Sequence, residues 1–395
     1  MSNEGKIRIG ENIRIIPGYP FNSRLFNSDG DGLPLIRIRD LLKSKIETFY
    51  SGEFSDEFTI SEGDILIGMD GDFHIVKWQN KRKALLNQRI MKVAQKQGAL
   101  IDIKYFYYFL SPFLKNIHDK TTATTVKHLS TYDISNAFEK FPPLSEQSQI
   151  ALILNTADSV IEKTKIAIAK YKAIKKGMLQ DLSTRGIDIQ TGKLRPKIID
   201  APELYKESKL GMIPKEWDAE RLGNRAIIEY GKSQKDVVSI NGTIPVYGTG
   251  GLMEYAIDYL FDGESILIGR KGTIDKPFYI TGKFWTVDTA YYLSSFKGNV
   301  RWLYYQLEKY DLKRLNEATG VPSINREQLY DIQIAFPQKN EQDEIVKRVY
   351  SIDKKLNTEQ NCLLKIQLLK AGLMADLLNG KKVVKVEKST EIVNQ

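Results

Sequence analysis

The sequence predicts a duplicated α/β (α+β) protein: two globular domains, each followed by a long helix, with the two helices pairing as an antiparallel coiled coil. Residues 141–182 recur at 336–377, with changed side chains but unchanged phase, at an offset of 195. A fainter match joins 64–71 to 265–272 at an offset of 201. Offsets shared over such lengths indicate two copies of one unit, so we expect an internal pseudo-twofold repeat.

Each long helix is predicted from the way it begins and from a sustained heptad pattern. Prolines at 142 and 337 end the preceding element, and Ser145 or Asn340 stands where an N-cap is expected. Apolar residues then alternate at spacings of four and three, with polar breaks at 164 and 175 and again at 359 and 370. This spacing is typical of helices that pack along their length. The seam positions are Ile150, Leu154, Ile161, Ile168, Met178, Leu182, Ile345, Val349, Leu356, Leu363, Ile366 and Leu377.

A single helix of this kind could lie on its own globular domain. Two matched helices, separated by a whole domain, favour pairing with each other instead. At 1.5 Å per residue the first would be about 55 Å long, well beyond the usual globular helix.

The globular parts share a scaffold and differ in their surface residues. Ile65–Ile67 and Ile266–Ile268 are apolar runs that predict buried strands, each followed by a glycine turn. The residues after these turns have diverged between the two copies. The predicted division is a first globular domain at 1–144, a long helix at 145–182, a connector at 183–205, a second globular domain at 206–339, a second long helix at 340–379, and a basic tail at 380–395 that we expect to be disordered.

Composition points to a nucleic-acid partner and away from several other classes. The net charge of +9 and the pI near 9.1 are the electrostatic footprint of a nucleic-acid binder. No apolar run reaches the roughly 18 residues of a membrane helix, and the first residues lack the apolar core of a signal peptide, so we expect a cytoplasmic protein without membrane contact. One cysteine, Cys362, and three histidines suggest neither a disulfide framework nor a transition-metal site.

Basic and polar residues cluster in the diverged stretches, where lysines could contact phosphates and Asn, Gln or Arg could contact base edges. The aromatic run Tyr105–Tyr108 is instead expected to pack a helix into the core. The candidate DNA-binding residues are Lys77, Gln79, Lys81, Arg82, Lys83, Lys232, Ser233, Gln234, Lys235, Arg270, Lys271 and Lys276.

Catalytic motifs are weak. Gly231-Lys232-Ser233 fits the loosest form of a phosphate-binding loop, but it lacks the extra glycines and the following helix that would make a nucleotidase site. Asp64, Asp70 and Asp72 could form a nuclease site, yet Asp64 and Asp70 align with a serine and a lysine in the second copy, so we expect them to cap turns. The sequence therefore predicts no enzymatic activity for this chain.

Several motifs, taken in order, resemble the specificity (S) subunit of type I restriction-modification systems. They are the duplicated Phe-Pro…Glu-Gln…Ile start of each long helix, the stretch Ser208–Trp217 that opens the second half, the strand and turn Ile268–Gly272, and Met69–Phe73 with Asn87–Arg89. The first half departs from the family pattern, because Asn12–Pro17 stands in place of its Gly-x-Ile-Pro-x-x-Trp opening.

The resemblance implies that each globular domain is a target recognition domain for one half of a split, asymmetric sequence in double-stranded DNA. It also implies that the helices separate the domains and dock two methyltransferase (M) subunits, which carry S-adenosylmethionine, while restriction (R) subunits complete the complex. This chain itself would hold no cofactor. The alternative is a duplicated nucleic-acid-binding adaptor whose coiled coil recruits a different partner.

Overall fold

The computed structural model describes residues 5–43, 45–121 and 126–384, which form two compact units. One unit combines Met1–Lys163 with Leu363–Gln395, and the other is Thr164–Cys362. Each long helix therefore contributes one end to each unit. Part of the predicted disordered tail, 385–395, lies outside the described residues.

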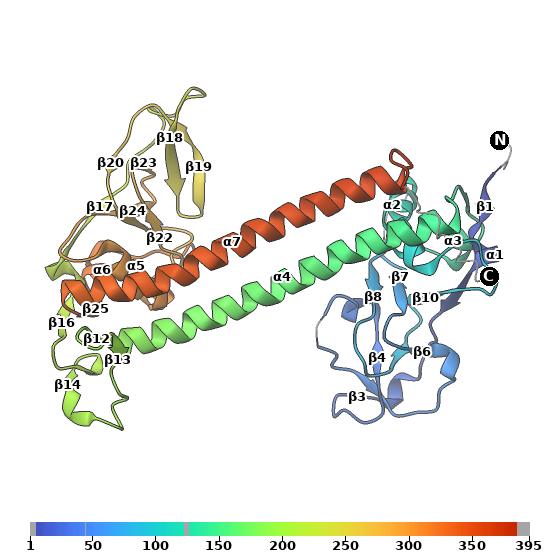
Figure 1. Ribbon diagram of the computed structural model, residues 1–395, viewed down its shortest axis with the longest axis horizontal. Helices are drawn as coiled ribbons and strands as arrows, with labels where there is room; N and C mark the ends of the chain where they lie inside the picture. The colour runs from blue at the N-terminus through green and yellow to red at the C-terminus, as the bar shows by residue number, and fades with distance from the viewer. Residues whose placement is uncertain (1–4, 44, 122–125, 385–395) are drawn as a thin grey trace, which may run out of the picture. The chain divides into compact units, whose positions relative to one another are not determined.

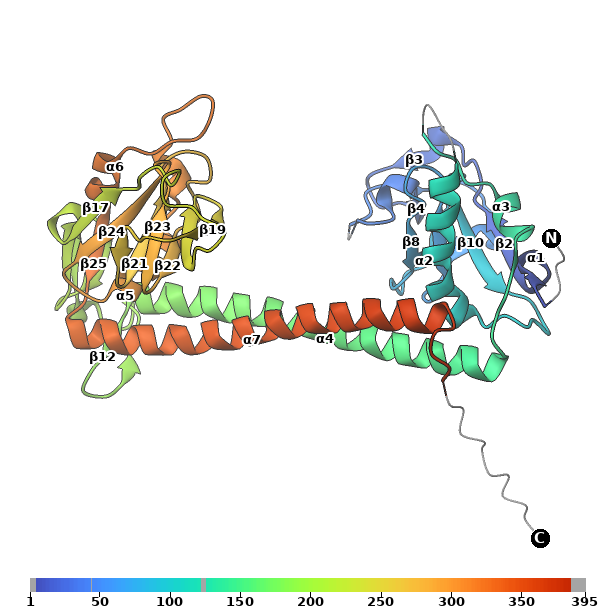
Figure 2. The same ribbon diagram turned by 90° about the horizontal axis from the view of Figure 1, so that it is seen from above.

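The first unit is built on a four-stranded sheet in the order β2-β10-β7-β8. Three of its strands, β10, β7 and β8, are labelled in Figure 1. Helix α2 lies along one face of this sheet (Figure 2), where Phe106 and Leu110 pack on Ile67 and Val93. A second sheet has the order β3-β5-β4-β9-β6. The elements are β1 (Ile7–Arg8), α1 (Ile9–Asn12), β2 (Ile13–Pro17), β3 (Phe26–Asn27), β4 (Leu33–Ile36), β5 (Phe49–Tyr50), β6 (Thr59–Ile60), β7 (Ile65–Gly68), β8 (Ile75–Lys77), β9 (Ala84–Leu86), β10 (Ile90–Gln95), α2 (Ile103–Lys120), α3 (Thr131–Ser135) and β11 (Phe138–Glu139).

The second unit repeats this plan with the sheets β17-β24-β21-β22 and β19-β18-β23-β20. Its elements are β12 (Ile187–Asp188), β13 (Lys193–Leu194), β14 (Tyr205–Ser208), β15 (Gly211–Pro214), β16 (Asp218–Arg221), β17 (Ala226–Tyr230), β18 (Ile244–Gly248), β19 (Gly251–Ala256), β20 (Phe261–Asp262), β21 (Ser265–Gly269), β22 (Phe278–Ile280), β23 (Lys283–Thr286), β24 (Ala290–Phe296), α5 (Val300–Lys309), α6 (Arg326–Asp331) and β25 (Gln333–Phe336).

The two units share their strand topology. In the sheets β2-β10-β7-β8 and β17-β24-β21-β22 the second strand in the order pairs antiparallel with both of its neighbours. In the other large sheet of each unit one pair is parallel, β4 with β9 and β18 with β23. The predicted apolar runs are the buried strands β7 and β21. The internal repeat is thus confirmed in the strand order as well as in the sequence.

The long helices are α4 (Leu144–Thr184) and α7 (Lys339–Leu378). The expectation that Ser145 and Asn340 cap them is wrong, because both lie inside the first turn. The backbone N–H of Gln147 already bonds the Pro143 carbonyl, at 2.9 Å, so the helix begins earlier. Pro143, directly before the helix, has no backbone N–H that would need a partner, which suits a helix start.

A buried glutamine docks the start of each long helix onto its globular part. Gln147 Oε1 accepts the N–H of Asp102, and its Nε2 donates to the Pro142 carbonyl, both at 2.8 Å. Gln342 makes the matching bonds to Asn299 and Pro337, again at 2.8 Å. Asp102 and Asn299 are the N-cap residues of α2 and α5, so each glutamine fixes a long helix to a capped helix of the domain.

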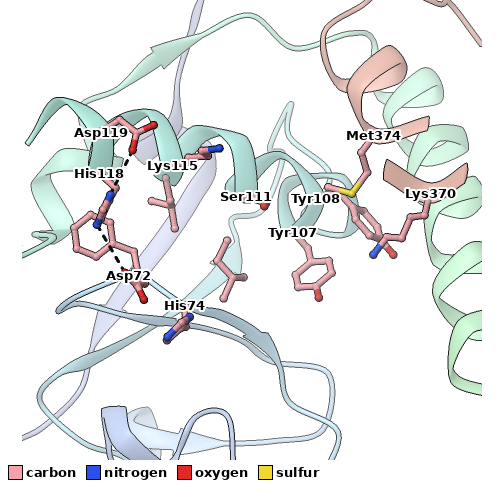
Figure 3. A pocket seen from close by; sticks show the side chains of 13 residues that line it. Asp72, His74, Tyr107, Tyr108, Ser111, Lys115, His118, Asp119, Lys370 and Met374 are labelled. Carbon is pink, nitrogen blue, oxygen red and sulfur yellow. Dashed lines mark hydrogen bonds and ion pairs between the residues drawn. The ribbon is translucent and has the colours of Figure 1, made fainter. Parts of the chain in front are cut away.

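A Tyr–Asp–Lys cluster joins three helices within each unit. In the first, the Tyr108 hydroxyl donates to Asp158 at 2.8 Å, and Asp158 pairs with Lys370 of α7 at 2.5 Å. Figure 3 shows the side chains of Tyr108 and Lys370 next to each other. In the second, Tyr305 donates to Asp353 at 2.7 Å, and Asp353 pairs with Lys175 of α4 at 2.9 Å. The polar breaks in the heptad pattern at 175 and 370 are therefore the lysines of these ion pairs.

Apolar contacts accompany both clusters. Ile150 and Leu154 of α4 pack with Leu377 of α7 in the first unit. Leu179 and Leu182 of α4 pack with the buried start of α7 in the second. The start of one long helix thus lies against the end of the other inside each unit.

The segment predicted as a connector contains ordered structure. It forms the β12–β13 hairpin, and Ile187 is buried. The carboxylate of Glu341, in the first turn of α7, accepts hydrogen bonds from Arg195, Trp217 and the Ile187 backbone. The bonds from Ile187 and Arg195 anchor the segment to α7. They also pair a buried carboxylate that would be costly without partners.

Candidate nucleic-acid interface

Two loops of the second domain begin at one edge of the sheet β17-β24-β21-β22. We call this edge the strand-end edge. Strand β17 ends at Tyr230 and β21 ends at Gly269, and both ends pair with the start of β24. All seven candidates of this domain lie in the loops that follow these two strands. They are Lys232, Ser233, Gln234, Lys235, Arg270, Lys271 and Lys276.

Two arginines and a tyrosine meet at this edge. The guanidinium carbons of Arg270 and Arg326 lie 5.2 and 5.0 Å from the centroid of the Tyr230 ring, within cation–π range. Arg270 also donates to the Asp288 carbonyl at 3.2 Å, and Arg326 lies 5.8 Å from the Tyr330 ring. The Arg326 Nε is buried and has no hydrogen-bond partner within the described residues.

A glycine-rich turn borders the same edge. The β18–β19 turn, 248–251, lines an open cleft of about 550 Å³ together with Gln234 and Asp288. Lys271 donates its backbone N–H to Thr289, which also lines the cleft. Lys232, Lys235 and Lys271 are exposed, so the loops at this edge combine guanidinium groups placed on an aromatic ring with exposed ammonium groups.

The first domain has an equivalent strand-end edge. Gly18 directly follows β2, and Gly231 directly follows β17. A Cβ added at either glycine would come within 2.0 Å of a backbone carbonyl oxygen. Gly71 bonds the Lys127 carbonyl at 3.0 Å, as Gly272 bonds that of Pro322 at 2.9 Å. The backbone of this part of the strand-end edge, which we call the corner, is thus the same in both domains.

The side chains at the two corners differ. In the first domain His128 Nδ1 lies 2.7 Å from Asp70, and Arg89 pairs with the same carboxylate at 3.5 Å. Asp70 and His128 form an isolated bridge, and the corresponding residues of the second domain, Lys271 and Ser323, form one as well. One backbone corner therefore presents an acidic and imidazole pair in one domain and arginines with a tyrosine in the other.

Comparison with known proteins identifies the family. A model described as the type I restriction modification DNA specificity domain matches residues 3–170 and 214–368. The chain belongs to this family. Each of the two matched segments covers one copy of the repeat.

Among curated relatives of the specificity family, the Escherichia coli type I restriction enzyme EcoBI specificity subunit is 35% identical over 214 residues, which is 53% of this chain and 44% of that protein. The MjaVIII specificity subunit of Methanocaldococcus jannaschii is 25% identical over 96% of this chain and 93% of its own length. The type I S subunit of M. genitalium has the same fold, with a TM-score of 0.69, 16% identity, and coverage of 94% of this chain and 95% of that one.

Specificity subunits are the non-catalytic DNA-recognition components of their systems, and this chain is accordingly not an enzyme. Two of the carboxylates considered for a nuclease site are separated in the structure. Asp64 and Asp70 lie at opposite ends of β7, Asp64 capping a turn at the Ser61 N–H. No group of three or more His, Cys, Asp or Glu side chains suited to a metal ion occurs among the described residues.

The phosphate-loop resemblance at Gly231 also has no structural support. Strand β17 precedes it, but no helix follows, and the next regular element is β18. The Lys232 carbonyl instead accepts a hydrogen bond from the Trp285 indole at 2.9 Å.

Within the described part of the chain, no helix is both long enough and apolar enough to cross a bilayer.

The first-domain candidates lie away from the strand-end edge of this specificity-family fold. Lys77 pairs with Ile65 at the beginning of β7, whereas Asp70 follows the end of that strand. Arg82 donates to the Gly32 carbonyl at 3.0 Å and lies over the Phe49 ring, so it supports a loop. Lys77, Gln79, Lys81, Arg82 and Lys83 are exposed, and their role in DNA binding stays a prediction.

Sequence reasoning missed four residues at the two corners. They are Tyr230 and Arg326 in the second domain and Arg89 and His128 in the first. The available signal was the 195 offset that relates His128 to Ser323, since each of them lies three positions before the first residue of a capped helix. Tyr105 and Tyr108 are buried in α2, as predicted.

Proposed function

We propose that this chain recognises a bipartite, asymmetric target in double-stranded DNA, with one half bound by each domain. The observation that carries the proposal is the repeated strand-end edge, which keeps one backbone and changes its side chains. A shared backbone suits two domains that approach DNA in the same way. Different side chains suit half-sites of different sequence, because bases are distinguished by the groups that contact them.

We further propose that the recognition domains are 1–144 and 206–339 and that α4 and α7 pair along their length as an antiparallel coiled coil. Two matched ion pairs support this, Asp158 with Lys370 and Asp353 with Lys175. Every seam residue is at least partly buried, from Ile150 and Val349 at 0% exposure to Ile161 at 9% and the half-buried Leu356. The helices would then hold the domains apart by a fixed length.

Two linked domains bind DNA with an advantage that neither has alone. Once one half-site is occupied, the second contact is effectively intramolecular, so affinity rises without any new contact. The net charge of +9 adds a sequence-independent attraction to phosphates that weakens with salt. Specificity would come from the two edges together.

Because this chain is not an enzyme, we propose that the chemistry comes from its partners. Two M subunits carrying S-adenosylmethionine would dock on the helices, and R subunits would complete a restriction complex. The chain itself would hold no cofactor. An adaptor that recruits a different partner remains the second candidate, distinguished by whether M co-purifies.

The test is to co-express the chain with a cognate M subunit and to map methylated bases in the host DNA. We expect M to co-purify with the chain, and methylation at one split sequence with an unspecified spacer. Methylation at a continuous sequence would contradict the bipartite target. Failure to co-purify with M, combined with salt-sensitive DNA binding, would favour the adaptor.

A further inference from the structure

The arginines of the second domain's corner contact aromatic rings, while most of their hydrogen-bonding groups have no partner among the described residues. Arg326 lies over Tyr230 and Tyr330, and its side chain is 33% exposed. Its nearest carboxylate, Glu327, is 3.9 Å from Nε, and the buried Nε has no hydrogen-bond partner among the described residues. Buried donors usually have partners, so this guanidinium has hydrogen-bonding capacity that the described residues leave unused.

Arg270 is placed on the same ring with one of its nitrogens already fixed. It lies 5.2 Å from the Tyr230 centroid, and its Nη1 donates to the Asp288 carbonyl. Stacking and this bond orient the rest of the guanidinium. Two oriented guanidinium groups at one aromatic ring form a compact set of donors that matches a pair of acceptor atoms.

DNA offers such acceptors both in its phosphates and on the major-groove edge of guanine, at O6 and N7. Two observations favour the base edge. The lysines at 232, 235 and 271, in the loops that follow β17 and β21, are exposed and can contact phosphates. The equivalent corner of the first domain also has a different composition, Asp70 with His128 and Arg89, although phosphates are the same in every sequence.

We infer that Arg270 and Arg326, oriented by Tyr230, form a guanine-recognition site that specifies one G·C pair in the half-site of the second domain. The inference rests on the proposed bipartite DNA recognition. It names the base class that this edge selects. Arg326 would make the bidentate contact, because its fork is the freer of the two.

The experiment begins with the methylation map of the wild-type complex, which defines the two half-sites. Each guanine of the second half-site is then replaced in turn by 7-deazaguanine, which lacks the N7 acceptor, and binding to the duplex is measured for the intact complex. We expect one position at which this replacement weakens wild-type binding roughly ten- to a hundred-fold. A second half-site without a G·C pair, or one at which no replacement matters, would overturn the inference.

Three variants then assign the contact. Arg326→Gln should bind normal and 7-deaza duplexes equally at that position, and methylation should spread to sites with another base there. Arg326→Lys keeps the charge without the fork, so it should lose the same discrimination while retaining more affinity. Arg221→Gln is the control, since it removes one charge from the same domain at an arginine paired with Asp331; its discrimination should match the wild type.

A uniform loss of affinity for all duplexes in Arg326→Gln, with a weaker salt dependence, would show a phosphate contact and overturn the inference. If Arg326→Gln does not fold, Arg270→Gln and the 7-deaza series on the wild type still decide the question. The proposed function fails separately, when the wild type itself shows no bipartite target. Recognition of the first half-site should stay unchanged in every variant.

Discussion

At the residue scale, the Tyr–Asp–Lys clusters explain how the globular domains are fixed to the helices. Burial, the hydrogen bond to Asp158 and the negative charge of Asp158 all raise the pKa of Tyr108 above its ordinary value of 10.0. Burial, the hydrogen bond to Asp353 and its charge raise the pKa of Tyr305 in the same way. Each phenol therefore stays protonated in the folded chain at a pH where it would ionise in the unfolded chain.

The consequence is a specific loss of stability in alkali. A raised folded-state pKa contributes stability that is complete below about pH 10 and is lost as the pH rises beyond it, because only the unfolded state then releases the proton. In Tyr108→Phe this part of the dependence should vanish, so Tm should fall less steeply between about pH 9 and 11. At neutral pH the variant should lose about 1 kcal/mol with its hydrogen bond.

Thermal melting across this pH range measures the difference. Tyr132→Phe, at a tyrosine that is 72% exposed, is the control and should follow the wild type. Parallel slopes for Tyr108→Phe and the wild type would mean that the buried phenol does not control the alkaline limit.

The docking glutamines give a second prediction at this scale. Gln147→Ala leaves the Asp102 N–H and the carbonyls of Leu100 and Pro142 without their partner inside the core. Each buried group left unpaired costs about 1–3 kcal/mol. We expect a clear fall in the free energy of unfolding, measured in urea, whereas the exposed Gln360→Ala should change it little. Equal effects would show that the glutamine does not dock the helix.

At the element scale, apolar residues of one long helix differ in burial according to whether they lie on the predicted seam. Ile161, on the predicted seam, is 9% exposed, while Ile166, one and a half turns further, is 61% exposed. Ile161→Asp should cost several kcal/mol, because it puts a charge in an apolar contact. Ile166→Asp, the matched control, should melt close to the wild type.

Melting of the isolated chain separates these variants before any partner is added. Co-purification with M should then fail for Ile161→Asp if the paired helices form the docking surface. A stable, fully assembling Ile161→Asp variant would contradict the coiled coil.

The long helices could be predicted from the sequence because they show a heptad period, and the duplication because matched segments share an offset. It could not predict the strand-end edge, since that depends on β17 and β21 ending on either side of β24, far apart in the chain. For the same reason Arg326 was missed, and the basic loop at 77–83 was grouped with the second-domain candidates. The polar breaks at 175 and 370 were found by pattern, but their ion pairs needed the fold.

At the scale of the whole molecule, the proposed helix pair would set the distance between half-sites. Four residues inserted after Lys172 add about 6 Å of rise and about 400° of rotation, which displaces the apolar face by only about 40°. Since DNA rises about 3.4 Å per base pair, the spacer should lengthen by one or two pairs, with both half-site sequences unchanged.

A two-residue insertion is the contrasting variant. It turns the seam by about 200° and should abolish assembly. Methylation maps of both variants measure the outcome. An active four-residue variant with an unchanged spacer would show that these helices do not set the distance.

The most direct test of the two-domain proposal is a domain exchange read out by methylation mapping. Residues 206–335 are replaced by the equivalent segment of another specificity-family protein whose target is known, and the chimaera is expressed with M. We predict that the half-site of the second domain changes to that of the donor, while the half-site of the first domain and the spacer stay as in the wild type. A change in both half-sites, or in neither, would contradict independent recognition by the two domains.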